Sequence, residues 1–124
     1  MIRLLLFGCD REFPQSRRRV LEHAGIQIKA VENSEGALKL LRAWPFDILM
    51  IGQEVPLHDR NKLSLAAKSL HKLRVIFLYR GSISQAESAD ALLSAEVSTE
   101  DLVSAIRRLV GFPIEDAGLS RSAV

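Results

Sequence analysis

Cysteine and long apolar stretches are both scarce in this sequence. Cys9 is the single cysteine among 124 residues, so no disulfide can form within one chain and nothing supports an oxidising compartment. No apolar run approaches the ~18 residues that a membrane-spanning helix needs. The run from Leu4 to Phe7 is also too short for the hydrophobic region of a signal peptide. These absences predict a cytoplasmic protein.

An excess of one charge is missing as well. Seventeen Lys and Arg residues stand against fifteen Asp and Glu residues, which leaves a net charge of +2. This balance permits a nucleic-acid partner but does not argue for one. The hydrophobic content of 48% and the charged content of 26% are ordinary for a folded domain. We predict one domain over residues 1–111 and a flexible tail over residues 112–124, where apolar anchors are few.

What the sequence does contain is organised around residues 46–56. The run Ile48–Ile51 has neither charge nor alternation, which predicts a strand buried on both faces. The strand ends at Gly52, and Pro56 then turns the chain away from the sheet. In an open parallel sheet, ligands bind just beyond the carboxyl ends of the strands. Gly52 therefore lies where a reactive group is expected, and it has no side chain to react.

The rest of the chain alternates between strand and helix patterns. Residues 81–90 leave room for only a turn or two of helix. Five strands alternating with five helices predict an α/β fold with a parallel sheet covered on both faces. The other predicted strands span residues 2–7, 26–31, 74–79 and 91–93. The other predicted helices span residues 14–24, 34–44, 60–72 and 100–110. Asn33 or Ser34 is expected to cap the second helix, and Thr99 the last.

Helical spacing also predicts which side chains face the core. The inward residues predicted for the four longer helices are Phe13, Val20, Leu21 and Ala24; Ala37, Leu40, Leu41 and Trp44; Leu63, Ala66, Ala67 and Leu70; and Leu102, Val103, Ile106 and Leu109.

Several of these segments fall in register with one family. They are Ala24-Gly25 at the end of the first helix, the run from Asp47 to Ile51, Pro56, the strand from Val75 to Leu78 and the helix start from Thr99 to Leu102. Together they resemble the receiver domain of two-component response regulators over residues 2–110. The resemblance implies a flavodoxin-like (CheY-like) three-layer sandwich with a five-stranded parallel sheet in the order 2-1-3-4-5 and a shortened fourth helix.

By the same resemblance, the family's phosphoacceptor aspartate falls on Gly52. Its acidic pair after the first strand falls on Gly8-Cys9, or on Cys9-Asp10 with a one-residue gap. Glycine has no nucleophile, and a hard cation such as Mg²⁺ prefers several carboxylate ligands, of which Asp10 and Glu54 alone remain nearby. We therefore predict no catalytic residue, no metal site, no cofactor and no enzymatic activity.

The family's switch threonine or serine falls on Tyr79, and its lysine-proline pair falls on Ala95-Glu96. Exchanging aspartate for glycine predicts a void at the strand ends, which packed interiors do not keep. One hypothesis is that the Tyr79 ring leans over the vacated pocket. The alternative is that Tyr79 lies on the surface with its hydroxyl group in water.

These features favour a degenerate receiver that works as a phosphorylation-independent protein-binding module. By resemblance, its partner face lies on the fourth helix, fifth strand and last helix, around Leu92, Glu96, Arg107 and Arg108. The expected partner is a histidine kinase, an output protein, a transcription component or a second copy of the chain. No membrane partner is expected.

Three alternatives remain open at this point. A phosphorelay receiver could use Glu54 as its acceptor. The other carboxylate of this segment, Asp47, starts the strand and therefore lies ~16 Å from the strand end at ~3.3 Å per residue. Nucleic acid could bind the basic helix through Arg11 and residues 17–19, although consecutive helical residues fan out by about 100°. A redox sensor could use Cys9, although buried cysteines are more often inert. The histidines show no metal-ligand spacing: His23, His58 and His71.

Overall fold

The sheet has the predicted order. The computed structural model describes residues 2–9, 13–70, 73–80 and 89–111. Five parallel strands lie in the order β2-β1-β3-β4-β5, which confirms the expected topology. The strands are β1 (Ile2–Phe7), β2 (Ile26–Val31), β3 (Ile48–Ile51), β4 (Arg74–Tyr79) and β5 (Ala91–Ser94).

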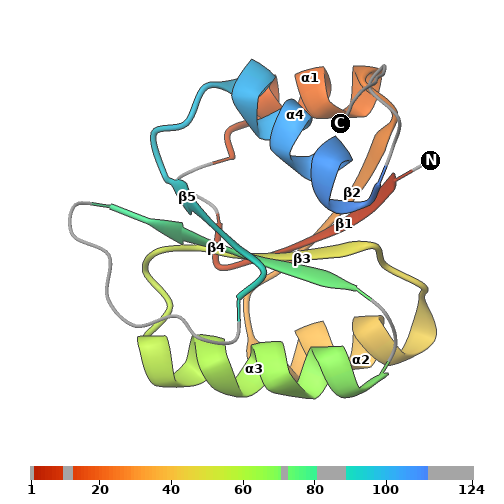
Figure 1. The fold of residues 1–124 in the computed structure, drawn as a ribbon. Coiled ribbons are helices and arrows are strands. Elements are labelled where there is room, and N and C mark those ends of the chain that lie inside the picture. Colours follow the sequence, from red (N-terminus) through yellow and green to blue (C-terminus); the bar gives the residue numbers. More distant parts are fainter. Residues whose placement is uncertain (1, 10–12, 71–72, 81–88, 112–124) are drawn as a thin grey trace, which may run out of the picture.

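Helices cover both faces of this sheet (Figure 1). One face carries α1 (Gln15–His23) and α4 (Thr99–Leu109), and the other carries α2 (Ser34–Ala43) and α3 (Leu57–Leu70). The last predicted helix is thus α4 in this structure. The shortened fourth helix falls largely on residues 81–88, and the predicted tail on residues 112–124, both outside the described residues. No described helix has the length and apolar character needed to cross a membrane.

The central strands build two cores because successive side chains point to opposite faces. Leu4 and Leu6 pack toward α1 and α4, whereas Leu5 and Phe7 pack toward α2 and α3. All four residues of β3 are buried, as the uncharged run predicted. Each fully buried aliphatic side chain contributes about 1.5–3 kcal/mol, so β1, β3 and β4 hold the sheet while β2 and β5 form its edges.

Helix ends follow capping chemistry, with one correction. Asn33 caps α2 as expected, because its Oδ1 atom accepts a hydrogen bond of 2.7 Å from the Gly36 amide. The prediction that Thr99 caps α4 was wrong. Ser98 is the cap, and its Oγ atom accepts from the Asp101 amide at 3.1 Å.

Three predicted core residues are exposed instead. Val20 is 50% exposed, because its neighbour Leu21 takes the inward position of α1 and a helix turns by about 100° per residue. Trp44 is 46% exposed because it follows the last helical residue and its backbone is extended, so helical spacing no longer applies. Leu70 is 39% exposed at the last turn of α3. In the same helix Ser64 is fully buried, which the apolar pattern did not predict.

Candidate functional site

The candidate site lies at the carboxyl edge, the side of the sheet where β1, β3 and β4 end. Gly8 follows β1 with a φ of 66°, and it lies against Gly52, which follows β3. A Cβ atom built on Gly52 would lie 1.9 Å from the Gly8 carbonyl oxygen and 2.7 Å from its carbonyl carbon. The Gly52 amide also donates to the Phe7 carbonyl at 2.9 Å. Position 52, where the resemblance places the family's aspartate, therefore has no room for any side chain.

Gly8 is constrained from its other side as well. A Cβ atom on Gly8 would lie 2.5 Å from Cγ2 of Val55, and its positive φ is a conformation that favours glycine. Val55 is held over Gly8 by a turn in which its amide donates to the Gly52 carbonyl at 3.3 Å. The Gly8 backbone and the Val55 side chain therefore take up the space around Gly52, so no void remains where the aspartate was expected to leave one.

The Cys9 thiol points into the protein rather than toward the carboxyl edge. Cys9 is 2% exposed, and its Sγ atom lies 3.4 Å from the Phe7 carbonyl and 3.5 Å from the Met50 carbonyl, both of which accept from it. It belongs to the core between the sheet and α1 and α4. Asp10, the other residue of the expected acidic pair, lies outside the described residues.

Tyr79 and Ala95 lie side by side where β4 and β5 end. The Ala95 amide donates to the Tyr79 carbonyl at 2.7 Å, and Ala95 is only 7% exposed. The family's lysine position thus holds a small buried residue. Tyr79 is half-buried, and Glu54 and Glu96 are exposed. In the part of the chain that the structure describes, no three His, Cys, Asp or Glu side chains gather as a metal site would require.

Arg60 is a residue at this edge that the sequence did not single out. It reaches from α3 over the ring of Phe77, 5.5 Å from the ring centre, and its NH1 atom donates to the Leu78 carbonyl at 3.3 Å. Its Nε atom is buried without a hydrogen-bond partner among the described residues. Burial lowers the pKa of Arg60 below the usual arginine value, because removing water disfavours the charged form. Nothing in the helical pattern of α3 distinguishes this arginine from an exposed one.

The arginine cluster of α1 is largely structural. Arg17 donates to the Val97 carbonyl and, at 3.2 Å, to the Thr99 hydroxyl oxygen, so it joins α1 to the segment before α4. Arg18 donates from Nε to the Phe13 carbonyl at 3.0 Å. Arg19 is exposed, and Arg11 lies outside the described residues. The guanidinium groups therefore do not form one open basic surface.

The residues of the expected partner face do not all point outward. Leu92 is 37% exposed on the edge strand β5, and Glu96 and Arg108 are exposed. Arg107 instead donates from NH2 to the Ala24 carbonyl at 2.9 Å, beyond the end of α1. Its guanidinium group stabilises the contact between α1 and α4.

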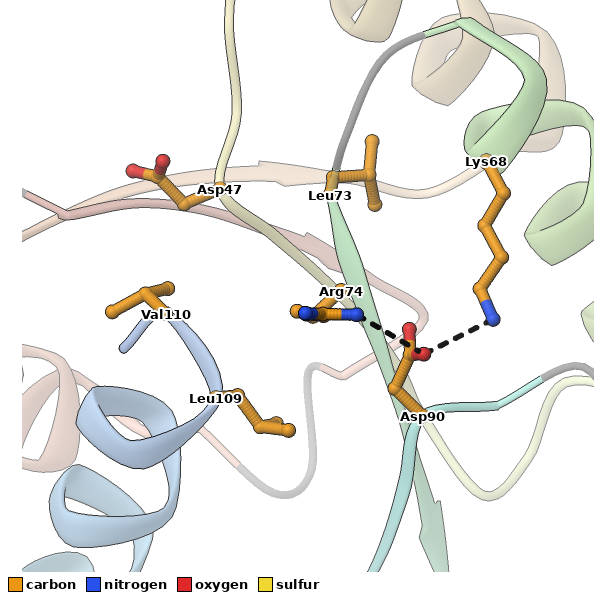
Figure 2. A pocket seen from close by; sticks show the side chains of 7 residues that line it. All are labelled: Asp47, Lys68, Leu73, Arg74, Asp90, Leu109 and Val110. Carbon is orange, nitrogen blue, oxygen red and sulfur yellow. Dashed lines mark hydrogen bonds and ion pairs between the residues drawn. The ribbon is translucent and has the colours of Figure 1, made fainter. Parts of the chain in front are cut away.

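The amino edge, where the strands begin, carries a cavity of about 420 Å³ (Figure 2). Asp90 accepts from the Val75 amide at 2.7 Å and forms ion pairs with Lys68 at 3.2 Å and Arg74 at 3.9 Å. Asp47 accepts from the Arg3 amide at 2.8 Å. These carboxylates satisfy amides at the starts of β4 and β1. The described lining residues are Asp47, Lys68, Leu73, Arg74, Asp90, Leu109 and Val110.

A second cavity of about 420 Å³ lies at the same edge, beside β2. Trp44 is exposed in it, and the Arg3 guanidinium and Lys29 ammonium groups each lie 5.7 Å from the centre of its indole ring. The described lining residues are Arg3, Glu22, Ile26, Gln27, Ile28, Lys29, Trp44 and Phe46.

Comparison with known proteins identifies the fold. No family model matches the chain, and no curated protein matches it significantly in sequence. A response regulator from Thermotoga maritima superposes with a TM-score of 0.76 at 12% identity, covering 89% of this chain and 98% of that one. A two-component response regulator from Clostridium difficile gives 0.72 at 16% identity, with coverages of 89% and 96%.

A third similar solved structure contains a phosphorylated aspartic acid. This response regulator from Burkholderia pseudomallei, with a phosphorylated aspartic acid, calcium ion and citrate, gives a TM-score of 0.68 at 21% identity, covering 89% of this chain and 69% of that one. At such identities the likeness establishes the fold alone. That fold is the one of CheY-like response regulator receiver domains, as the sequence resemblance implied.

Proposed function

We propose that this chain is an atypical receiver that transmits a signal by binding protein, without accepting a phosphoryl group. The shared fold supports a role in two-component-type signalling at a coarse level. The observation that carries the proposal is the contact between Gly8 and Gly52, where an added Cβ atom would lie 1.9 Å from a carbonyl oxygen.

Phosphoryl transfer to a receiver needs a carboxylate nucleophile and a divalent cation that neutralises the developing charge. At this carboxyl edge the backbone of Gly8 takes the place of the carboxylate side chain. Ala95 supplies no cation where the family has lysine, and it is nearly buried. The site lacks the carboxylate and the lysine, and the Gly8 backbone occupies the space that the carboxylate would need. Introducing an aspartate at position 52 alone therefore does not restore the pocket.

The alternative acceptors are poorly placed. Asp47 lies at the amino edge, where its Oδ2 atom already accepts from the Arg3 amide at 2.8 Å. Glu54 is exposed in the turn after β3, two residues beyond Gly52. A phosphorelay through Glu54 would need a cation site that its described surroundings do not offer.

The proposed partner is a histidine kinase, an output protein, a transcription component or a second copy of the chain. We place the first candidate contact surface on β5 and α4, around Leu92, Glu96 and Arg108, which are exposed. Arg107 stands beside them but is bonded to α1. An exposed leucine on an edge strand is the type of apolar anchor that protein interfaces use.

The proposal is tested by incubating the protein with acetyl phosphate and Mg²⁺ and measuring its intact mass, with a phosphorylatable receiver as the positive control. We expect the mass to stay unchanged. A stable increase of one phosphoryl group would contradict the proposal. Its loss in Glu54→Gln, but not in Asp47→Asn, would identify the acceptor and establish the phosphorelay alternative.

A further inference from the structure

The outer side of β2 is an unpaired strand edge. The carbonyls of Gly25 and Val31 accept from β1, from the amides of Ile2 at 3.2 Å and Gly8 at 3.4 Å. In a regular parallel ladder, alternate residues direct both backbone groups to the same side. The odd-numbered residues of β2 therefore bond to β1, and the backbone groups of Ile26, Ile28 and Ala30 point outward. Since β2 ends the sheet, no described strand pairs with them.

One face of this edge is basic and aromatic. Arg3 and Lys29 lie on the α2 face, because Arg3 alternates with Leu4 and Lys29 is in register with Leu5. Trp44 lies between them with 46% of its surface exposed and both cations 5.7 Å from its ring centre. Two fixed positive charges beside an exposed indole favour a carboxylate-bearing ligand.

The opposite face of the edge is apolar. Ile26 and Ile28 point toward α1, where Ile26 is buried and Ile28 is half-buried against the core. Glu22 supplies the one acidic group that lines this cavity among the described residues. An added strand would thus meet positive charge on one face and mainly aliphatic surface on the other.

We propose that the β2 edge binds an extended, acidic segment of a partner protein by strand addition. The main-chain groups of Ile26, Ile28 and Ala30 supply the hydrogen bonds, and alternate side chains of the partner supply specificity. Acidic side chains face Arg3, Lys29 and Trp44, and apolar side chains lie along Ile28. This surface is distinct from the one on β5 and α4, and it rests on the proposed function only in assuming that the chain acts by binding protein.

Charge argues against a second copy of the chain as the occupant. Pairing two β2 edges would bring Arg3 and Lys29 of both copies to one seam, and like charges across a strand pair are destabilising. A lysine on an edge strand is also a common device against self-pairing. An acidic partner strand reverses the sign of both interactions.

Trp44 makes the test direct, because it is the single tryptophan of the chain. The probe is a short synthetic peptide that alternates glutamate and valine. It is compared with a lysine-valine peptide and with a glutamate-valine peptide N-methylated at alternate residues, which cannot donate along one edge. We expect the first peptide to shift Trp44 emission saturably, and the other two to bind at least about tenfold more weakly.

Lys29→Glu should lower the affinity for the acidic peptide by about tenfold. The control is Lys39→Glu, the same charge change at an exposed position of α2, which should leave the affinity nearly unchanged. Equal losses in both variants, or equal binding of the methylated peptide, would overturn the proposal. A dimer in sedimentation that Lys29→Glu strengthens would replace the acidic partner by a second copy. The phosphorylation assay is independent, so a phosphorylated chain would refute the proposed function without touching this inference.

Discussion

The carboxyl and amino ends of the strands differ in the space that they leave for side chains and ligands. At the carboxyl edge, where parallel α/β domains usually hold their ligands, Gly8 and Gly52 bring two backbone segments into contact and leave no room for a side chain. At the amino edge, two cavities of about 420 Å³ are lined by charged and aliphatic side chains, and the one beside β2 also by Trp44 and Phe46. In this fold, backbone packing alone therefore closes the carboxyl edge to side chains, while cavities with charged lining residues lie at the amino edge.

The largest loss of stability is expected for a substitution at the carboxyl edge. Gly52→Ala should lower the free energy of unfolding by about 3 kcal/mol or more, because the added methyl group overlaps the backbone carbonyl of Gly8, directly after β1. The control is Gly25→Ala, where nothing lies within 4 Å of the added atom and only the positive φ of 89° opposes it. That strain costs about 1 kcal/mol. Urea denaturation followed by circular dichroism measures both, and equal losses would contradict the close contact.

A smaller effect is expected at Gly8. Gly8→Ala should cost about 2–3 kcal/mol, since it combines a positive φ of 66° with a clash against the Val55 side chain. A side chain can be shortened, so Val55→Ala in the same chain should recover part of the loss. A double-mutant cycle measures that coupling. Purely additive losses would show that Val55 does not pack on Gly8.

Asp90 tests the amino edge. Asp90→Ala should cost about 1–2 kcal/mol, because it leaves the amide of the buried residue Val75 without its acceptor and removes the ion pairs to Lys68 and Arg74. Asp90→Asn keeps an acceptor oxygen and should recover about half of that loss. If the two variants are equally destabilised, the ion pairs and not the amide hydrogen bond account for the role of Asp90.

The smallest effect separates the arginines of α1. Arg17→Ala should cost about 1 kcal/mol, because Arg17 bonds to Val97 and Thr99 across the fold. Arg19→Ala should change the free energy of unfolding by less than about 0.5 kcal/mol, because Arg19 is exposed. In a gel shift at moderate salt, we expect neither variant to differ from the natural chain in its effect on the mobility of DNA. A salt-dependent shift that Arg19→Ala removes would support the nucleic-acid alternative instead.

Much of the fold follows from local patterns. The uncharged run of β3, the alternation of β2 and the bounds of β4 all match the strands observed. Two errors lie at helix termini, since Trp44 leaves helical geometry after α2 and Ser98 rather than Thr99 caps the start of α4. A third lies within α1, where Val20 is exposed. A residue just beyond a helix end no longer follows the helical spacing, and spacing alone does not locate that end.

The site was predictable only in part. The sequence shows that position 52 lacks a carboxylate, but not that the Gly8 carbonyl lies against it, because this contact joins segments far apart in the chain. The same reason hides Arg60 over Phe77 and Arg17 on Val97. Local sequence therefore indicated a missing side chain and a space that must be filled, whereas only the long-range packing shows that the Gly8 backbone fills it.

One measurement tests the filled carboxyl edge most directly: treating Gly52→Asp with acetyl phosphate and Mg²⁺ while recording its intact mass and its unfolding free energy. We predict a destabilised protein that takes up no phosphoryl group, because the Gly8 backbone lies where the carboxylate would have to stand. A variant as stable as the natural chain that accepts one phosphoryl group at position 52 would show that only the aspartate was missing, and would contradict this account.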